Sequence, residues 1–143
     1  MKSDMDKITD LGHNKVLMVA DDGSGDGTQF TDLISRNFSL YAFRHGASMS
    51  THALAHYVRR TLADKLRKAP MMANTLVAGH DEEEGTLYWI DYMASLQRLN
   101  FAAHGYASNF LYSILDRYWQ PDLDLEEAKD VIRKCIAEIQ KRF

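Results

Sequence analysis

Three short apolar runs along the chain have the length and composition of β-strands. Residues 15–20 form the first run, which ends at an Asp-Asp-Gly segment, residues 21–23. Residues 74–79 and 86–92 form the other two, and the segment between them, residues 80–85, is acidic and ends in glycine. These two runs are therefore predicted to form a β-hairpin with a solvated tip.

Two helices are predicted between the first strand and the hairpin. Residues 29–45 carry apolar positions at helical spacing, Thr28 is placed to cap the helix, and Gly46 marks its end. The second helix is predicted to begin near Ser48 or Ser50. The apolar positions are Phe30, Leu33, Ile34, Phe38 and Tyr41 in the first helix, and Ala53, Leu54, Tyr57, Val58, Leu62 and Leu66 in the second.

Two more helices are predicted after the hairpin. One covers about residues 107–119 and stops before Pro121. The other begins at Asp124, and Glu127 follows it at the spacing of a capping box. Apolar residues recur along this last helix at i, i+3 and i+4 spacing, which predicts one buried stripe. The stripe consists of Ala128, Ile132, Cys135, Ile136, Ile139 and Phe143.

The order of the predicted elements indicates the fold class. The predicted order is one strand, two helices, two strands and two helices. Strands and helices therefore do not alternate one by one, which argues against a doubly wound parallel sheet. The strands are nearly continuous apolar runs, as in sheets that are covered on both faces. We therefore predict a layered sandwich with one helix pair on each side of the strand layers. Three strands are few for four helices, and the helical pattern still continues at Phe143, so strands are expected to be missing from this sequence.

Composition and charge place the chain among globular proteins. Of its 143 residues, 45% are hydrophobic and 26% are charged, which suits one domain with a continuous core. The formal net charge of −3 argues against a nucleic acid or an anionic membrane as partner. A single cysteine, Cys135, excludes an internal disulfide and suits a reducing compartment. No apolar run is long enough to span a membrane, and residues 1–10 are too polar for a signal peptide, so we predict an intracellular protein.

The glycine-rich segment after the first strand has a weak likeness to phosphate-binding and calcium-binding turns. Its spacing, Gly23-x-Gly25-x-Gly27, matches neither a dinucleotide-binding turn nor a P-loop, and three aspartates would repel a phosphate. As a calcium loop it places Leu33 where a bidentate glutamate is required. We therefore predict an ordinary tight turn. The aspartates are Asp21, Asp22 and Asp26.

Two histidines and a group of basic residues lie on the second predicted helix. His52 and His56 stand four residues apart on one face, but neither a neighbouring glutamate nor a third ligand accompanies them, so polar-face histidines are favoured over a zinc site. Arg60, Asp64 and Lys68 have the i, i+4 spacing of ion pairs. Because the net charge is negative, the basic group is interpreted as a solvated or subunit-contacting face. The group consists of Arg59, Arg60, Lys65, Arg67 and Lys68.

The sequence contains no combination of residues that predicts an enzyme site. Cys135 falls on the predicted buried stripe of the last helix, which favours a core residue over a nucleophile. No serine or threonine stands in a nucleophile elbow, and Met1 and Lys2 supply no N-terminal nucleophile. We therefore assign no catalytic, cofactor-binding or metal-binding residue, and no cofactor.

Several stretches of the sequence together carry a family resemblance. The most specific are Phe-Ala-Ala-His-Gly-Tyr at residues 101–106 and Ser-Ile-Leu-Asp-Arg-Tyr at residues 113–118. The two hairpin segments, residues 76–81 and 88–92, match as well. Together these stretches resemble the β subunits of the eukaryotic 20S proteasome, from Met1 to Phe143. Further matching positions are Gly25, Asp26, Gln29, Phe30, Asn37, Leu40, Tyr41, Arg44, Arg60, residues 62–64, Leu66, Arg67, and residues 133–135 and 140–143.

The resemblance implies the Ntn-hydrolase fold. This is an α+β fold, a four-layer α-β-β-α sandwich in which two antiparallel sheets lie between two helical layers, and it agrees with the layering inferred from periodicity. The resemblance also implies that residues 1–143 are a single β-type domain truncated at both ends, with terminal strands missing.

The resemblance also indicates where a catalytic site would fall. Active members of the family use an N-terminal threonine whose own amine helps to activate its hydroxyl, with an aspartate and a lysine nearby. Both the threonine and the aspartate would precede this sequence. Lys7 falls at the position of the lysine, Gly23 near the turn of the oxyanion hole, and Tyr106 near the position of a catalytic serine. The match is to a subunit similar to the inactive members, so it implies no catalytic residue here.

The expected function is that of a non-catalytic structural subunit of the β ring, which supports ATP- and ubiquitin-dependent protein degradation by assembly and chamber formation. The expected partners are the other α and β subunits of this hetero-oligomeric particle, with no nucleic acid and no membrane, in the cytoplasm and nucleus. Two alternatives stay open. One is an active threonine endopeptidase whose nucleophile precedes this sequence, and the other is an independent binding module that uses residues 21–27.

Overall fold

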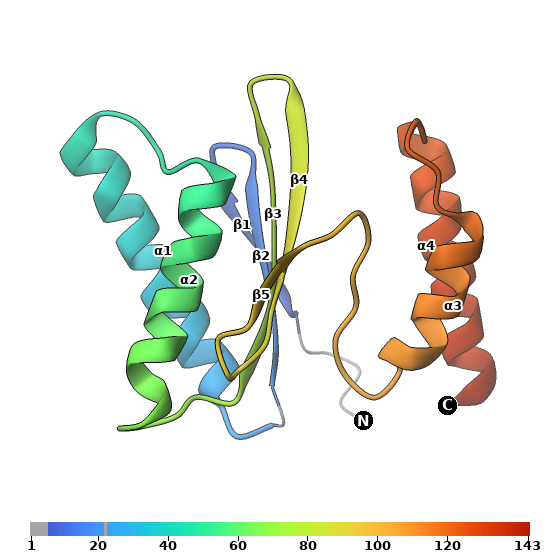
Figure 1. Ribbon diagram of the computed structural model, residues 1–143, viewed down its shortest axis with the longest axis horizontal. Helices are drawn as coiled ribbons and strands as arrows, with labels where there is room; N and C mark the ends of the chain where they lie inside the picture. Colours follow the sequence, from blue (N-terminus) through green and yellow to red (C-terminus); the bar gives the residue numbers. More distant parts are fainter. Residues whose placement is uncertain (1–5, 22) are drawn as a thin grey trace. The chain divides into compact units, whose positions relative to one another are not determined.

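The computed structural model describes residues 6–21 and 23–143, which divide into two compact units (Figure 1). The first unit ends at Asn100 and holds a β-sheet and two helices, and the second, residues 101–143, holds two further helices. In these described ranges, four helices with an antiparallel sheet confirm the predicted α+β class and are consistent with the expected Ntn-hydrolase fold.

The sheet of the first unit has five antiparallel strands, and strands that are neighbours in sequence are also neighbours in the sheet. The chain leaves this sheet once, after the second strand, to form both helices of the unit. In order, the strands are β1 (Ile8–Gly12), β2 (Lys15–Asp21), β3 (Ala73–Asp81), β4 (Glu84–Ile90) and β5 (Leu96–Arg98).

Two of these strands, β1 and β5, are absent from the sequence-based prediction. In β1, exposed positions alternate with half-buried ones, so the strand has no apolar run to mark it. β5 is only three residues long, which is too short to show a period. Both strands lie at the edges of the described sheet, where a strand pairs on one side only and needs less apolar surface.

Helices α1 (Asp26–His45) and α2 (Thr51–Leu66) cover one face of the sheet (Figure 1). Helix α1 packs on β1, β2 and β3, whereas α2 packs on β3, β4 and β5. Their N-termini differ from each other. Ser50 caps α2 by accepting a hydrogen bond from Ala53 N–H at 3.1 Å. Of the two start positions predicted for this helix, Ser48 and Ser50, the second is therefore confirmed. Thr28 does not cap α1, because that helix already begins at Asp26.

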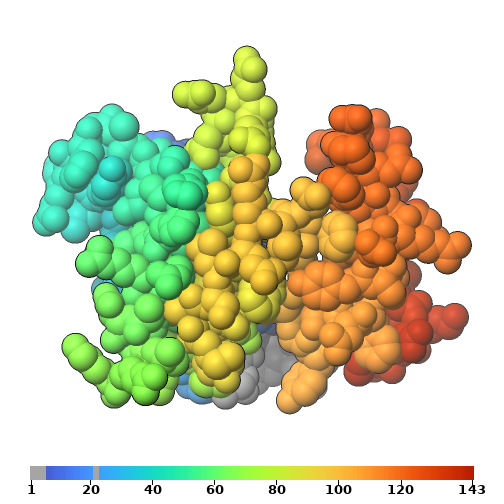
Figure 2. All heavy atoms as spheres, in the orientation of Figure 1, coloured from blue at the N-terminus to red at the C-terminus, as the bar shows by residue number. Residues whose placement is uncertain are grey.

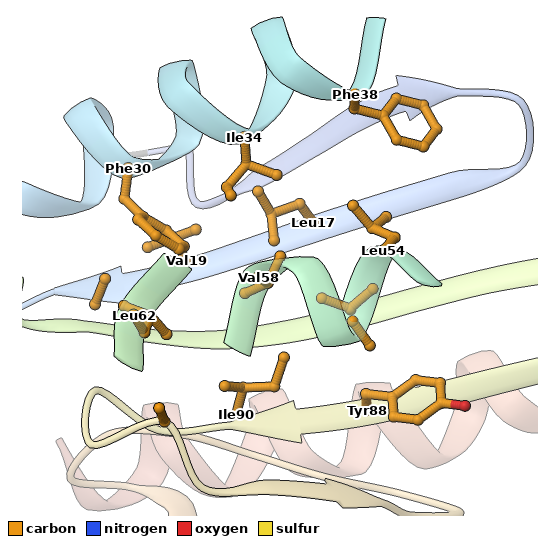
Figure 3. Packing of buried hydrophobic residues seen from close by; sticks show 14 of the residues in the cluster. Leu17, Val19, Phe30, Ile34, Phe38, Leu54, Val58, Leu62, Tyr88 and Ile90 are labelled. Carbon is orange, nitrogen blue, oxygen red and sulfur yellow. The ribbon is translucent and has the colours of Figure 1, made fainter. Parts of the chain in front are cut away.

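The core of the first unit lies between these helices and the sheet (Figure 3). Leu17 and Val19 of β2 are buried there, while the positions between and beside them, including Met18, are only half-buried. Alternate residues of β2 therefore point into this core. The side chains that meet these strands are Phe30, Ile34 and Phe38 from α1 and Leu54, Val58 and Leu62 from α2.

The β3–β4 hairpin has longer strands and a tighter turn than the sequence predicts. Asp81 pairs with Glu84, so only Glu82 and Glu83 form the turn, in place of residues 80–85. Glu82 adopts a left-handed conformation with a φ of 52°. The tip of this hairpin projects beyond α1 and α2 (Figure 2).

The second unit consists of α3 (Ser108–Tyr118) and α4 (Leu125–Arg142), which pack on each other. The predicted capping box of α4 is confirmed. Asp124 Oδ1 accepts a hydrogen bond from Glu127 N–H, Glu127 Oε2 accepts one from Asp124 N–H, and both are 2.9 Å long. The box satisfies two backbone donors that the first turn of a helix otherwise leaves unpaired.

The predicted buried stripe of α4 is confirmed only in part. Val131 and Cys135 are buried, where they pack with Leu115 of α3. Ile132 and Ile136 are 52% and 48% exposed. Within the second unit, α3 covers the side of α4 that carries Val131 and Cys135. Of the other predicted positions, Phe143 is exposed, and Ala128 and Ile139 are half-buried.

Candidate functional site

A partly buried ion pair joins the adjacent ends of β2 and β3. Lys15 Nζ lies 2.7 Å from Asp81 Oδ1 and donates a second hydrogen bond to the carbonyl oxygen of His13 at 3.0 Å. Lys15 is only 3% exposed. Burial raises the pKa of Asp81, but hydrogen bonds from Lys15 and Thr51 outweigh it and lower that pKa to about 2. Asp81 is therefore ionised at neutral pH.

The same carboxylate holds the N-terminus of α2. Asp81 Oδ2 accepts a hydrogen bond from Thr51 N–H at 2.8 Å. Thr51 is the first residue of α2, so this bond satisfies a donor that the helix cannot pair internally, and it places a negative charge at the positive end of the helix dipole. Asp81 thus links β2, β3 and α2.

Gly79 makes room for this cluster. A Cβ atom at this position would lie 2.1 Å from Thr51 Oγ1 and 2.6 Å from Lys15 Cδ. The side chains of Lys15 and Thr51 therefore occupy the space in which any larger residue would project. Because Lys15 is buried and paired, it cannot act as a base or nucleophile without breaking the ion pair. The arrangement is suited to holding three elements together.

The glycine-rich segment forms a tight turn into α1, as the sequence predicts. Gly23 and Gly25 both have a φ of +89°, a conformation that favours glycine. Asp26 Oδ2 accepts a hydrogen bond from Met72 N–H at 2.9 Å, so this carboxylate fastens the segment before β3. Asp22 lies outside the described residues, as does the side chain of Asp21.

The two histidines of α2 lie in contact on its exposed side. The ring centroids of His52 and His56 are 4.3 Å apart, and His52 Nδ1 lies 3.3 Å from Tyr88 Oη. Burial lowers the pKa of His56, and the charges of His52 and Arg59 lower it further. Within residues 6–21 and 23–143, no group of three or more histidine, cysteine, aspartate or glutamate residues is placed to hold a metal ion.

The basic group lies on α2 and on the two residues after it, Arg67 and Lys68; its members are mostly exposed, and Lys65 is half-buried. Asp64 has the predicted helical spacing to Arg60 and Lys68, yet among the described residues it forms an ion pair with neither. The spacing therefore permits these pairs without forming them. Exposed ion pairs contribute little free energy, so their absence costs the helix little.

Cys135 is buried against Leu115 and Val131, which confirms the prediction of a core residue. Burial raises the pKa of its thiol, so the reactive thiolate is disfavoured at neutral pH. The structure therefore gives Cys135 a packing role.

The positions marked by the family resemblance are on the surface. Lys7 is exposed, and its carbonyl oxygen accepts a hydrogen bond from Val19 N–H at 3.0 Å, which continues the pairing of β1 with β2. Gly23 is exposed in the turn before α1. Tyr106 is 97% exposed and follows Gly105, whose φ is +95°. Met1 and Lys2 lie outside the described residues.

The ion pair of Lys15 and Asp81 is the feature that the sequence-based reasoning missed. Its signal is weak: Lys15 opens an apolar run, and Asp81 stands in an acidic segment that is predicted to be solvated. Only the pairing of β2 with β3, which sets Lys15 opposite Gly79, brings the two residues to the same end of the sheet.

Among the described residues, no helix combines the length and apolar character that a membrane span requires.

Comparison with known proteins gives a match along the whole chain. The family model described as "Proteasome subunit" matches residues 1–143. The chain is 44% identical to "Proteasome subunit beta type-2" of Dictyostelium discoideum, over 100% of this chain and 74% of that protein. It is 44% identical to "Proteasome subunit beta type-2-B" of Arabidopsis thaliana, over 99% of this chain and 71% of that protein. It is 33% identical to "Proteasome subunit beta type-4" of Saccharomyces cerevisiae, over 100% of this chain and 73% of that protein.

These identities extend across both units, so the sheet with its two helices and the α3–α4 pair are similar to the same family. A family match over every residue, together with the α+β architecture, leads to one conclusion. The chain belongs to the proteasome subunit family.

Proposed function

We propose that this chain is a non-catalytic structural subunit of the β ring of the 20S proteasome, corresponding to the relatives named beta type-2. The observation that carries the proposal is the 44% identity to two such relatives over 99–100% of the chain. The chain supports protein degradation by assembly: it forms part of the wall that encloses the proteolytic chamber, and residues 1–143 act as one β-type domain.

The chemistry of the described residues supports a non-catalytic role. Lys7, at the position of the lysine of active members, is exposed, and its backbone continues the edge pairing of β1. The resemblance places Tyr106 near the position of a catalytic serine of active members, and a phenol lacks the small aliphatic hydroxyl of serine. The better-buried lysine, Lys15, is neutralised by Asp81. Two of these side chains are exposed, and the third is held in an ion pair.

The proposed partners are the other α and β subunits of the particle, and the proposed location is the cytoplasm and nucleus. Family membership supports assembly into a proteasome particle. The net charge of −3 supports protein neighbours in preference to nucleic acid or an anionic membrane.

The proposal is tested by tagging the chain at its natural locus, purifying it from cell extract and identifying the co-purified proteins by mass spectrometry. We expect α and β proteasome subunits in near-stoichiometric amounts at the size of the assembled core. Recovery of the tagged chain alone would overturn the proposal.

A second experiment separates the structural role from an active threonine endopeptidase. Particles carrying Lys7→Ala are compared with wild-type particles and with the matched surface variant Lys129→Ala. We expect equal hydrolysis of peptide substrates for all three, because a wall component does not attack the peptide bond. Loss of one hydrolytic activity in intact Lys7→Ala particles, with Lys129→Ala unchanged, would establish the endopeptidase.

A further inference from the structure

We propose that His52 and His56 on α2 form a two-imidazole site for a divalent transition-metal ion, with Cu²⁺ bound more tightly than Ni²⁺ or Zn²⁺. This inference goes beyond the assembly role and does not depend on it. The sequence alone offers only the i, i+4 spacing, which is common on helices. The structure adds the position of the rings, an anchor for one of them, and their access to solvent.

The rings are within chelating reach of one ion. Metal–nitrogen bonds to histidine are about 2.0–2.1 Å long, so two ligand nitrogens on one ion stand at most about 4 Å apart. The ring centroids of His52 and His56 are already 4.3 Å apart, with an angle of 49° between the ring planes. Side-chain rotation alone can bring one nitrogen of each ring to a shared ion. Both residues are exposed, so the ion and its remaining water ligands can enter.

Tyr88 holds one of the two ligands in place. His52 Nδ1 lies 3.3 Å from the hydroxyl oxygen of Tyr88, which is itself a buried residue of β4. An ion on Nε2 requires the ring proton to be on Nδ1, where it can be donated to Tyr88 Oη. Metal-binding histidines commonly have such an outer partner, which fixes the tautomer and the orientation of the ring.

Arg59 lies about one helical turn after His56 on α2. Its positive charge acts against a metal ion bound at the histidine pair. Removal of that charge should therefore tighten binding, and this gives the proposal a test that does not delete a ligand.

The number of ligands decides which ions bind. Among the described residues, no third histidine, cysteine, aspartate or glutamate completes the site, so water fills the other positions. Such an open, nitrogen-donating site follows the general affinity order in which Cu²⁺ exceeds Ni²⁺ and Zn²⁺. The bound ion keeps exchangeable positions, unlike the ion of a closed structural zinc site.

The test is a titration of the full 143-residue chain with Cu²⁺ at pH 7.5. Calorimetry measures the affinity, and electron paramagnetic resonance of the bound ion reports its nitrogen ligands. Wild type is expected to bind one Cu²⁺ at this site with hyperfine structure from two nitrogens. In His56→Gln the signal should fall to one nitrogen, and affinity should fall at least about tenfold, because the second bond no longer forms intramolecularly. His80→Gln, at an exposed histidine outside the pair, is the matched control and should bind like wild type.

Two further variants separate ligands from their surroundings. Tyr88→Phe should keep the two-nitrogen signal, while the affinity for Cu²⁺ falls about tenfold. Loss of the hydrogen-bond partner of a metal-binding histidine lowers metal affinity about 10–100-fold, and we expect the lower end of this range. Arg59→Gln should bind more tightly than wild type. If circular dichroism shows that His56→Gln does not fold, His52→Gln takes its place. A one-nitrogen signal in wild type, or unchanged affinity in the folded histidine variant, would overturn the proposal.

Discussion

Lys15 Nζ and Asp81 Oδ1 are 2.7 Å apart, and the other oxygen of the same carboxylate accepts the first backbone N–H of α2. One aspartate therefore neutralises a buried lysine and caps a helix. The pair fastens the start of β2, the end of β3 and the beginning of α2, so the fold depends on it at the point where three segments distant in sequence meet.

Removal of the lysine from this pair should destabilise the chain. Lys15→Met leaves Asp81 without its main partner, and loss of one member of a fully buried pair costs about 3–5 kcal/mol. The side chain of Asp81 is 34% exposed, so water offsets part of the loss and we expect about 1–3 kcal/mol. Urea unfolding followed by tryptophan fluorescence measures the change.

The matched control for this variant is Lys129→Met. Lys129 Nζ also contacts a carboxylate, Glu126 Oε1 at 3.0 Å, but both side chains are largely exposed. Its free energy of unfolding should stay within about 0.5 kcal/mol of wild type. Equal effects of the two substitutions would show that burial of Lys15 contributes nothing.

The stability of the chain should fall in acid partly because of Asp81. Its pKa is about 2 in the folded chain against an ordinary value of 3.8, so the folded state favours the ionised form. The resulting stabilisation is complete above about pH 5 and is lost as the pH falls toward about 2. After allowance for the partial exposure of Asp81, we expect it to amount to about 1–2 kcal/mol.

Asp81→Asn tests this pH dependence. The variant should be less stable than wild type at pH 7 and should lose less stability between about pH 5 and pH 2, because it has no carboxylate to protonate. Thermal unfolding measured across this range gives both slopes. Glu83→Gln, in the turn of the same hairpin, should keep the wild-type slope, and a wild-type slope in Asp81→Asn would contradict the assignment.

Gly79→Ala should also destabilise the chain, for a steric reason. The new Cβ would lie 2.1 Å from Thr51 Oγ1 and 2.6 Å from Lys15 Cδ, and both atoms belong to buried residues. Overpacking of this kind costs about 1–3 kcal/mol. Gly85→Ala is the control, since its Cβ would meet nothing nearer than His80 Cδ2 at 3.9 Å. Similar unfolding midpoints for the two variants would argue against crowding at Gly79.

Two neighbouring residues of α4 should respond differently to truncation. Val131 is buried against α3, and Val131→Ala should cost about 1–2 kcal/mol. Ile132 is 52% exposed, so Ile132→Ala should change the free energy of unfolding by about 0.5 kcal/mol or less. Chemical unfolding of both variants decides which face of α4 is buried. A larger loss of stability in Ile132→Ala than in Val131→Ala would show that the face predicted from the sequence is the buried one.

Much of the architecture can be predicted from local signals. Runs such as residues 15–20 identify strands, the spacing of Phe30, Ile34 and Phe38 identifies a helix, and the pair Asp124 and Glu127 identifies a capping box. Each of these signals lies within a few residues along the chain. The family resemblance belongs to the same category, because residues 101–118 carry its most specific motifs in one stretch.

The sequence by itself therefore determined the helices, the central strands, the α+β class and the family. Only the tertiary structure decided that Lys15 meets Asp81, that Ile132 stays exposed beside a buried Val131, and that the ring of His52 is held by Tyr88. The physical reason is that periodicity reports which side chains share a face, whereas burial and ion pairing depend on which distant segment packs against that face. That choice is made when the sheet and helices assemble.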